Sequence, residues 1–200
     1  MTFEGIDGSG KTTVSKRTFD VIRSRGERVV LTAEPTASWL GDAVRRSVEV
    51  DAGALVESFL FFADRAAHLR EIRAALARGE IVLCDRYADS TYAYQGARLE
   101  GKLTDPIAFL RRIGEPWVLK PDLTILIRVP AEVGMKRLEG RARRIRFEDA
   151  GFLRKVAANY DTLAKDKGFT VLDGGNPLEV VVDEAVRAIE AALTPSPGRA

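Results

Sequence analysis

The sequence contains very little of the residue types on which many enzyme sites depend. Its 200 residues include one cysteine, Cys84, and one histidine, His68. A single cysteine excludes an internal disulfide, and one cysteine with one histidine excludes a Cys/His zinc cluster. One histidine also leaves little room for a serine–histidine or cysteine–histidine nucleophile. Phosphoryl transfer suits this inventory, because it depends mainly on positioning and on positive charge.

A large excess of one charge and a long apolar run are also missing. Lys and Arg total 31 against 29 for Asp and Glu, so the net charge of +2 gives no general attraction to nucleic acid. No apolar run approaches the roughly 20 residues of a membrane span. The chain opens directly on an apolar strand and a glycine-rich motif, so we expect no signal peptide and a cytoplasmic protein. We expect one globular domain over residues 1–193 and a frayed tail over 194–200.

Short apolar segments alternate with helical patterns along the chain. Predicted strands cover 2–6, 28–32, 80–84, 122–129 and 169–172. Predicted helices cover 11–25, 40–48, 54–77, 89–97, 106–113, 131–139, 152–167 and 178–193. This alternation implies right-handed crossovers and an α/β fold, in which helices flank both faces of a parallel five-stranded sheet. Together with the motif described next, it predicts the three-layer fold of a P-loop NTPase.

The most informative motif occupies residues 5–12, which read Gly-Ile-Asp-Gly-Ser-Gly-Lys-Thr. Gly, four residues and Gly-Lys-Thr between a strand and a helix is the pattern of a P-loop. Backbone N–H groups and the helix N-terminus would cradle phosphate oxygens. The Lys11 ammonium would reach the β- and γ-phosphates, and the Thr12 hydroxyl would bind Mg²⁺. The alternative is a glycine-rich turn that only caps a helix. We predict ATP binding by Gly5, Asp7, Gly8, Ser9, Gly10, Lys11, Thr12 and Thr13.

A second group of polar residues follows the predicted strand 80–84. Asp85 at the strand end can hold Mg²⁺ directly or through water, and Arg86 offers a planar fork for a second phosphate. Tyr94 and Gln95 add an aromatic wall and an amide that can read a base or a sugar. The alternative is an Asp–Arg ion pair beside core tyrosines. Because ligands bind at the carboxyl ends of parallel strands, this group should meet the P-loop and the segment 34–36 at one sheet edge.

The predicted helix 54–77 carries apolar residues on more than one face. Phe61 and Arg65 lie one turn apart and could take a nucleobase and its phosphate; otherwise Phe61 is core and Arg65 a surface charge. A small apolar stripe indicates cover on a second side, by another subunit or by a neighbour within the chain. The predicted core stripe is Leu55, Phe59, Phe62, Ala66, Leu69 and Leu76, and the second stripe is Val56, Leu60, Ala63, Ala67 and Ala74.

Four arginines lie within residues 141–146. A charge run of this kind is often only a solvated face. Between two predicted helices it can instead form a lid, over about 139–149, that brings an arginine onto the transferring phosphoryl group. We name Arg143 and Arg146 as candidate catalytic residues.

These motifs together resemble the thymidylate kinase family, a nucleoside-monophosphate kinase type of P-loop enzyme. The resemblance covers nearly the whole chain. It depends on residues 3–13, on Glu34-Pro35-Thr36, on Leu-Phe-Phe-Ala-Asp-Arg at 60–65, and on Asp85-Arg86-Tyr87 running to Ala-Tyr-Gln-Gly at 93–96. Many members have Glu-Pro-Gly-Gly-Thr where this chain has Glu-Pro-Thr, so this loop is shorter here.

The resemblance implies transfer of the ATP γ-phosphoryl group to thymidine monophosphate (dTMP), with Mg²⁺. Asp7 would lie between the metal and the sugar 3′-hydroxyl, and Phe61 would stack on thymine. Arg65 and Arg86 would approach the base and the acceptor phosphate, and Tyr94 would crowd the 2′ position. The other implied contacts are Thr13 to ATP, Thr91 near the base edge, Gln95 beside Tyr94, and Glu34 and Pro35 within a monophosphate-binding region of about 34–77.

Some members of this family carry an arginine inside the P-loop, where this chain has Gly8. That difference implies a catalytic arginine in the lid. The implied metal ligands are Thr12, Asp7 and Asp85, and the implied catalytic residues are Lys11, Asp7, Arg86, Arg143 and Arg146. The family is also homodimeric through helix packing. Two alternatives remain: a deoxynucleoside kinase, and a nucleotide-binding switch or pseudo-enzyme, although neither Asn159 nor Asn176 begins the Asn-Lys-x-Asp motif of a GTPase.

Overall fold

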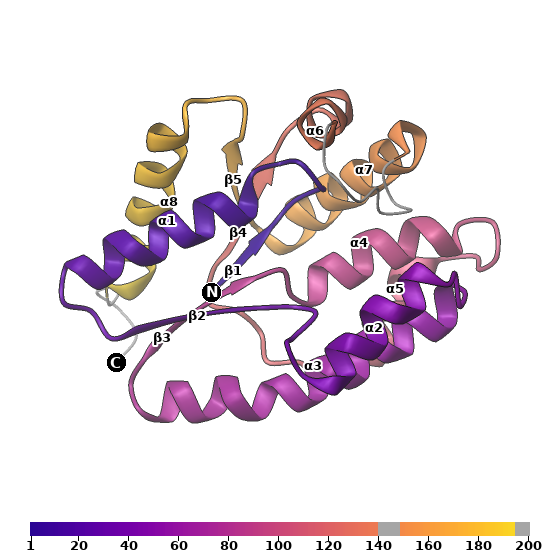
Figure 1. Ribbon diagram of the computed structural model, residues 1–200, viewed down its shortest axis with the longest axis horizontal. Helices are drawn as coiled ribbons and strands as arrows, with labels where there is room; N and C mark the ends of the chain where they lie inside the picture. The colour runs from indigo at the N-terminus through magenta and orange to yellow at the C-terminus, as the bar shows by residue number, and fades with distance from the viewer. Residues whose placement is uncertain (140–148, 195–200) are drawn as a thin grey trace.

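The computed structural model describes residues 1–139 and 149–194. A five-stranded parallel sheet runs through its centre in the order β2-β3-β1-β4-β5 (Figure 1). Its strands are β1 Thr2–Glu4, β2 Val29–Ala33, β3 Ile81–Asp85, β4 Thr124–Arg128 and β5 Thr170–Asp173. The helices in the described residues are α1 Lys11–Ser24, α2 Trp39–Glu49, α3 Ala54–Ala77, α4 Ala88–Leu99, α5 Pro106–Gly114, α6 Ala131–Leu138, α7 Ala150–Lys167 and α8 Leu178–Leu193.

Helices cover both faces of this sheet, which confirms the predicted three-layer P-loop fold. Helices α1 and α8 pack on one face, and α3, α4 and α7 lie on the other (Figure 1). Strand side chains alternate between the two apolar cores. Leu83 joins the core under α1 and α8, whereas its neighbours Val82 and Cys84 join the core under α3, α4 and α7. No described helix meets the length and hydropathy required of a membrane span.

The strand registers bring three motif-bearing segments to one edge of the sheet. Asp85 pairs in register with Phe3 on β1 and with Ala33 on β2, so these strands end at the same level. The P-loop, the segment 34–36 and Arg86 therefore leave the sheet side by side. This arrangement confirms the expectation that they meet at the carboxyl edge.

One expectation about helix α3 is wrong. Leu55, Phe59 and Leu76 were expected in the core, but these side chains are 44%, 53% and 42% exposed. Phe62 and Leu69 of the predicted stripe are buried as expected, but Arg65 and His68 face inward beside them and are almost fully buried. Polar partners on β2 and the loop after it account for this choice, because they satisfy the buried arginine and histidine.

Candidate active site

The P-loop follows β1 directly and ends at the first residue of α1. Its glycines Gly5, Gly8 and Gly10 have φ angles of 148°, 78° and 94°. At Gly8 an added Cβ would lie 2.2 Å from the Gly134 carbonyl oxygen of α6, so this position has no room for a side chain. The turn leaves the N-terminus of α1 at the carboxyl edge of the sheet, where its backbone dipoles favour an anion.

Lys11 is buried at the base of this turn. Its Nζ donates to the Ile6 carbonyl at 3.4 Å and lies 3.9 Å from Asp7 Oδ1. Burial, followed by the nearby Arg86 charge, lowers the Lys11 pKa to about 8. A bound phosphate would supply the negative charge that this ammonium requires, which is the electrostatic environment expected for a phosphate-binding lysine.

Asp7 links the P-loop lysine to Arg86. Arg86 Nη2 donates to Asp7 Oδ1 at 2.5 Å, and Nη1 donates to the Gly5 carbonyl at 3.3 Å. The Asp7 N–H donates to the Tyr94 hydroxyl at 2.9 Å, and the Arg86 guanidinium lies 5.0 Å from the Tyr94 ring centroid. Four side chains from three segments thus form one cluster, with Asp7 between two cations.

Thr12 and Asp85 form a second contact across the same edge. The Thr12 hydroxyl donates to Asp85 Oδ2 at 2.5 Å. Asp85 Oδ1 is buried and has no hydrogen-bond partner among the described residues. In residues 1–139 and 149–194, no group of three or more His, Cys, Asp or Glu side chains could hold a metal ion. One hydroxyl and one carboxylate with a spare oxygen fit Mg²⁺ that is also bound by nucleotide phosphates.

Arg65 is buried beside this cluster, so its interpretation as a surface charge is wrong. Its Nη2 donates to Glu34 Oε2 at 2.6 Å, to the Tyr87 carbonyl at 3.0 Å and to Thr91 Oγ1 at 3.0 Å. Glu34 Oε1 in turn contacts His68 Nδ1 at 3.0 Å. The Arg65 Nε and Nη1 atoms are buried without a partner in the described part of the chain. Buried donors of this kind call for an acceptor, and a ligand can supply one.

The remaining predicted residues occupy different positions around this centre. Ser9 is buried in the P-loop, whereas Thr13 is exposed on the first turn of α1. Phe61 and Pro35 are half-buried, which leaves each partly accessible. Gln95 on α4 is fully buried, and its Nε2 donates to Glu57 Oε2 on α3 at 3.4 Å. The lid arginines Arg143 and Arg146 lie outside the described residues.

Two side chains that support this site were not predicted. Asp64 accepts from the Thr36 N–H at 2.8 Å and from the Thr36 hydroxyl at 2.5 Å, so it holds the short loop after β2. Arg137 on α6 donates to the Ser9 carbonyl at 3.4 Å and to the Gly174 carbonyl at 2.9 Å, which ties α6 to the P-loop. Asp64 is adjacent to Arg65 in a motif already noted, whereas nothing in the sequence around Arg137 indicates its contact.

A third unpredicted side chain, Glu4, lies under the cluster at the end of β1. It is fully buried and accepts from the Tyr87 N–H at 2.8 Å, from the Ser90 hydroxyl at 2.6 Å and from the Tyr160 hydroxyl at 2.9 Å. Burial, followed by the nearby charge of Asp89, raises the Glu4 pKa to about 7, against the effect of these hydrogen bonds. Its hydrogen-bond donors come from the β3–α4 junction, from α4 and from α7, so Glu4 connects these segments to β1.

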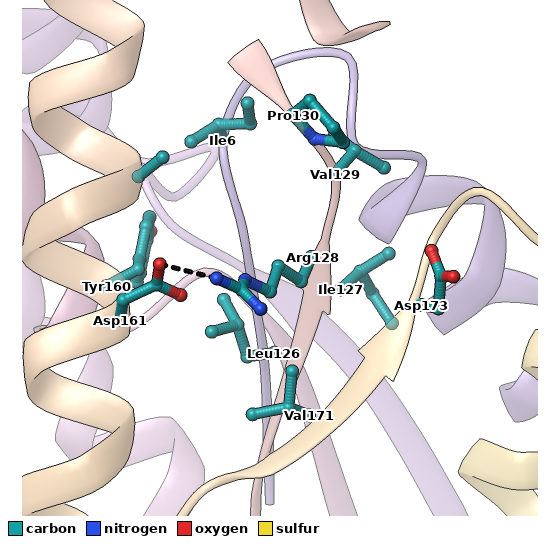
Figure 2. A pocket seen from close by; sticks show the side chains of 11 residues that line it. Ile6, Leu126, Ile127, Arg128, Val129, Pro130, Tyr160, Asp161, Val171 and Asp173 are labelled. Atoms are coloured by element: carbon teal, nitrogen blue, oxygen red, sulfur yellow. Dashed lines mark hydrogen bonds and ion pairs between the residues drawn. The ribbon is translucent and has the colours of Figure 1, made fainter.

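A cavity of about 630 Å³ lies behind the P-loop, between α7 and strands β4 and β5 (Figure 2). Ile6 lines it from the P-loop and Tyr160 from α7. Arg128 Nη2 reaches across it to Asp161 Oδ2 at 2.8 Å, so these two of its three charged lining residues pair with each other. None of Lys11, Arg65 and Arg86 lines this cavity, which distinguishes it from the cluster around Asp7.

Comparisons with known proteins identify the family of this chain. The family model described as thymidylate kinase matches residues 3–185. A "Probable thymidylate kinase" of Natronomonas pharaonis is 43% identical over 198 residues, covering 97% of this chain and 98% of its own. Proteins of the same name from Methanospirillum hungatei and Halobacterium salinarum are 41% and 42% identical, and the alignments cover 94% and 96% of this chain and 92% and 96% of theirs. The chain belongs to the thymidylate kinase family.

Proposed function

We propose that this protein transfers the γ-phosphoryl group of ATP to dTMP, giving thymidine diphosphate and ADP. One observation carries the proposal: Lys11 Nζ and Arg86 Nη2 both approach the same oxygen, Asp7 Oδ1, at 3.9 Å and 2.5 Å. Lys11 belongs to the P-loop, which would hold the donor phosphates. Arg86 comes from the β3–α4 junction and would hold the acceptor phosphate. The site thus offers two candidate phosphate-binding cations beside one carboxylate, one for the donor and one for the acceptor, which suits a transfer between two nucleotides.

The proposed mechanism depends on positioning and on positive charge. The P-loop N–H groups and Lys11 would bind the triphosphate, and Arg86 would leave Asp7 to grip the acceptor phosphate. Asp7 would then be available to accept from the sugar 3′-hydroxyl. Charge on the transferring group would be stabilised by Lys11 and Arg86, in the way that fixed cations stabilise a phosphoryl-transfer transition state. The additional lid arginines, Arg143 and Arg146, stay a prediction.

Thr12 and Asp85, with Asp7 nearby, would hold Mg²⁺ together with the donor phosphates. When bound, Mg²⁺ neutralises phosphate charge during transfer. Thr12 would contribute its hydroxyl, and Asp85 would act through its unpaired Oδ1, directly or through water.

The region 34–77 would recognise the acceptor nucleoside. Arg65 has two buried donors without partners among the described residues, and a thymine carbonyl is an acceptor that fits them. Phe61 would stack on the base, and Thr91 would lie at its edge. Tyr94 is held by Asp7 and Arg86 and would exclude a 2′-hydroxyl. These contacts favour thymidine monophosphate over a ribonucleotide.

An assay of ADP release across a panel of acceptors tests the function. The panel is dTMP, dUMP, dCMP, AMP, GMP and thymidine, each with ATP and Mg²⁺. We expect the highest kcat/KM with dTMP. Turnover of thymidine without turnover of dTMP would instead support a deoxynucleoside kinase, and binding of ATP without any turnover would support a pseudo-enzyme.

Replacing Phe61 by alanine is expected to raise the KM for dTMP by about tenfold, because it removes a stacking surface worth roughly 1 kcal/mol or more. The KM for ATP should stay unchanged. Steady-state kinetics in both substrates measure the two constants. The matched control is Phe19→Ala, because Phe19 is also half-buried but lies on α1, across the sheet. An unchanged KM for dTMP in Phe61→Ala would assign Phe61 to the core.

We also propose that the protein is a homodimer that pairs through α3. Leu55, Val56 and Phe59 form an apolar face with exposed fractions of 44%, 49% and 53%. Light scattering after size-exclusion chromatography should give the mass of a dimer for the wild type. Phe59→Glu should give a monomer, because a charge would be buried at the interface. The control Val180→Glu changes a similarly exposed residue on α8 and should stay dimeric. A monomeric wild type would refute this proposal.

A further inference from the structure

Glu4 holds a buried carboxylate that accepts three hydrogen bonds close to Arg86. It is 0% exposed, and its three donors lie on the β3–α4 junction, on α4 and on α7. The substrate contacts proposed above use none of these bonds. A buried carboxylate is costly unless it is paired or hydrogen-bonded, so a residue that serves only packing would be better apolar.

The first donor belongs to the peptide that follows Arg86. Arg86 has a φ of 66°, a left-handed conformation that is unfavourable for a residue with a side chain. Such a conformation persists only when its surroundings enforce it. Here β1 binds the backbone on both sides of the strained residue: the Arg86 N–H donates to the Phe3 carbonyl at 2.9 Å, and the Tyr87 N–H donates to Glu4 at 2.8 Å.

The second donor, Ser90, connects Glu4 to the guanidinium itself. Its hydroxyl donates to Glu4 at 2.6 Å and lies 3.2 Å from Arg86 Nη1, which donates to it. The third donor, Tyr160, lies 2.8 Å from the Ser90 hydroxyl and packs edge-on against Tyr94 with the ring centroids 6.4 Å apart. Glu4 thus restrains the backbone next to Arg86 through Tyr87 and the Arg86 guanidinium through Ser90. It also binds α7 through Tyr160.

We propose that Glu4 is a positioning residue for the acceptor phosphate, because its carboxylate fixes the position of Arg86 relative to the P-loop. Glu4 is the last residue of β1, and the P-loop begins at the next residue, Gly5. This proposal rests on the role of Arg86 in the proposed function. Because β1 continues directly into the P-loop, the C-terminal end of this one strand determines the positions of both proposed phosphate-binding cations, Lys11 and Arg86. Small displacements of reacting groups lower the reaction rate by large factors, so holding both cations from the end of one strand should increase the rate of transfer.

The network requires a carboxylate and not an amide. Tyr87 N–H, Ser90, Tyr160 and Arg86 Nη1 all supply hydrogens to this pocket, and Glu4 supplies two acceptor oxygens. Glutamine would replace one acceptor by a donor of nearly the same shape. At least one hydroxyl would have to turn around, and the contact between Ser90 and Arg86 would loosen.

Glu4→Gln tests the proposal in the full-length protein at pH 8, where the wild-type carboxylate is mostly ionised. We expect the KM for dTMP to rise by about tenfold or more, while the KM for ATP stays within about twofold. Ser90→Ala and Tyr160→Phe each remove one donor and should raise the KM for dTMP by a smaller factor. Tyr92→Phe is the matched control, because Tyr92 is equally buried and its hydroxyl has no partner among the described residues.

The outcomes separate positioning from general structure. A Glu4→Gln protein that melts like the wild type and has unchanged constants, or constants changed equally for both substrates, would overturn the proposal. If Glu4→Gln does not fold, the double variant Ser90→Ala/Tyr160→Phe decides: a selective rise in the KM for dTMP supports positioning, and its absence overturns it. Failure of the proposed function itself is distinct, because it shows in the wild type as missing dTMP turnover.

Discussion

Replacing Lys11 by methionine is expected to lower kcat by a factor of about 10³ or more with little loss of folding stability. Lys11 provides the buried ammonium at the base of the P-loop, 3.9 Å from Asp7. Removing a fixed charge from a developing phosphoryl transition state costs about two to three orders of magnitude for a single donor, and a cation should cost at least as much.

The burial of Lys11 allows the effect on kcat to be separated from the effect on folding stability. Because burial lowers its pKa to about 8, the folded protein holds this charge at a cost. Methionine retains an unbranched chain as far as Cε and lacks the ammonium that is costly to bury, so we expect the melting temperature to stay the same or to rise. Asp7 keeps its contact with Arg86.

Single-turnover kinetics with saturating ATP and dTMP, together with thermal unfolding, measure both quantities. Lys16→Met is the control, because Lys16 lies on the same helix but is exposed. Near-normal turnover in Lys11→Met would refute the assignment of residues 5–12 as a functional P-loop.

Replacing Arg86 by glycine is expected to lower kcat/KM for dTMP by a factor of about 10³, because the acceptor phosphate would lose its guanidinium. Glycine suits the backbone here, since Arg86 has a φ of 66° and glycine adopts this conformation without a steric penalty. The substitution therefore removes the side chain without straining the β3–α4 junction.

The comparison with Arg86→Lys sharpens this test. Lysine keeps the charge but cannot contact Asp7, Gly5 and Ser90 together, as the two guanidinium nitrogens do. We expect it to recover only a small part of the lost activity. Arg154→Gly, at an exposed ion pair with Glu132, controls for the loss of an arginine. Full activity in Arg86→Gly would show that the acceptor phosphate binds elsewhere.

Local sequence signals predicted every helix and strand described here. The glycines that follow α1 and α3 are an example: Gly26 and Gly79 have φ angles of 87° and 72°, the left-handed conformation that glycine adopts just after a helix end. These signals act within a few residues, so they can be read from the chain directly. The P-loop, Asp85 and Arg86 were predicted in the same way, because each lies at the end of a recognisable strand.

Periodicity alone could not show which side of α3 faces inward. That helix is apolar over much of its surface, and its buried side includes Arg65 and His68. Their burial depends on Glu34 and Thr32, which lie more than thirty positions earlier in the chain. Glu4 was missed for the same reason, since Tyr160 is separated from it by 156 positions. Polar networks of this kind are set by tertiary contacts and have no short-range pattern.

The contact between Gly8 and α6 has a consequence for how this family varies. An added Cβ at position 8 would stand 2.2 Å from the Gly134 oxygen, and one at position 134 would stand 2.6 Å from the Asp7 oxygen. The backbone of the P-loop and the backbone of α6 therefore pack directly against each other at two glycines. An arginine side chain at position 8 would overlap with α6 in its present position. A P-loop arginine would require both a substitution at Gly8 and a shift of α6, and these two segments lie more than 120 residues apart in the chain. A single substitution at Gly8 is therefore not compatible with this fold.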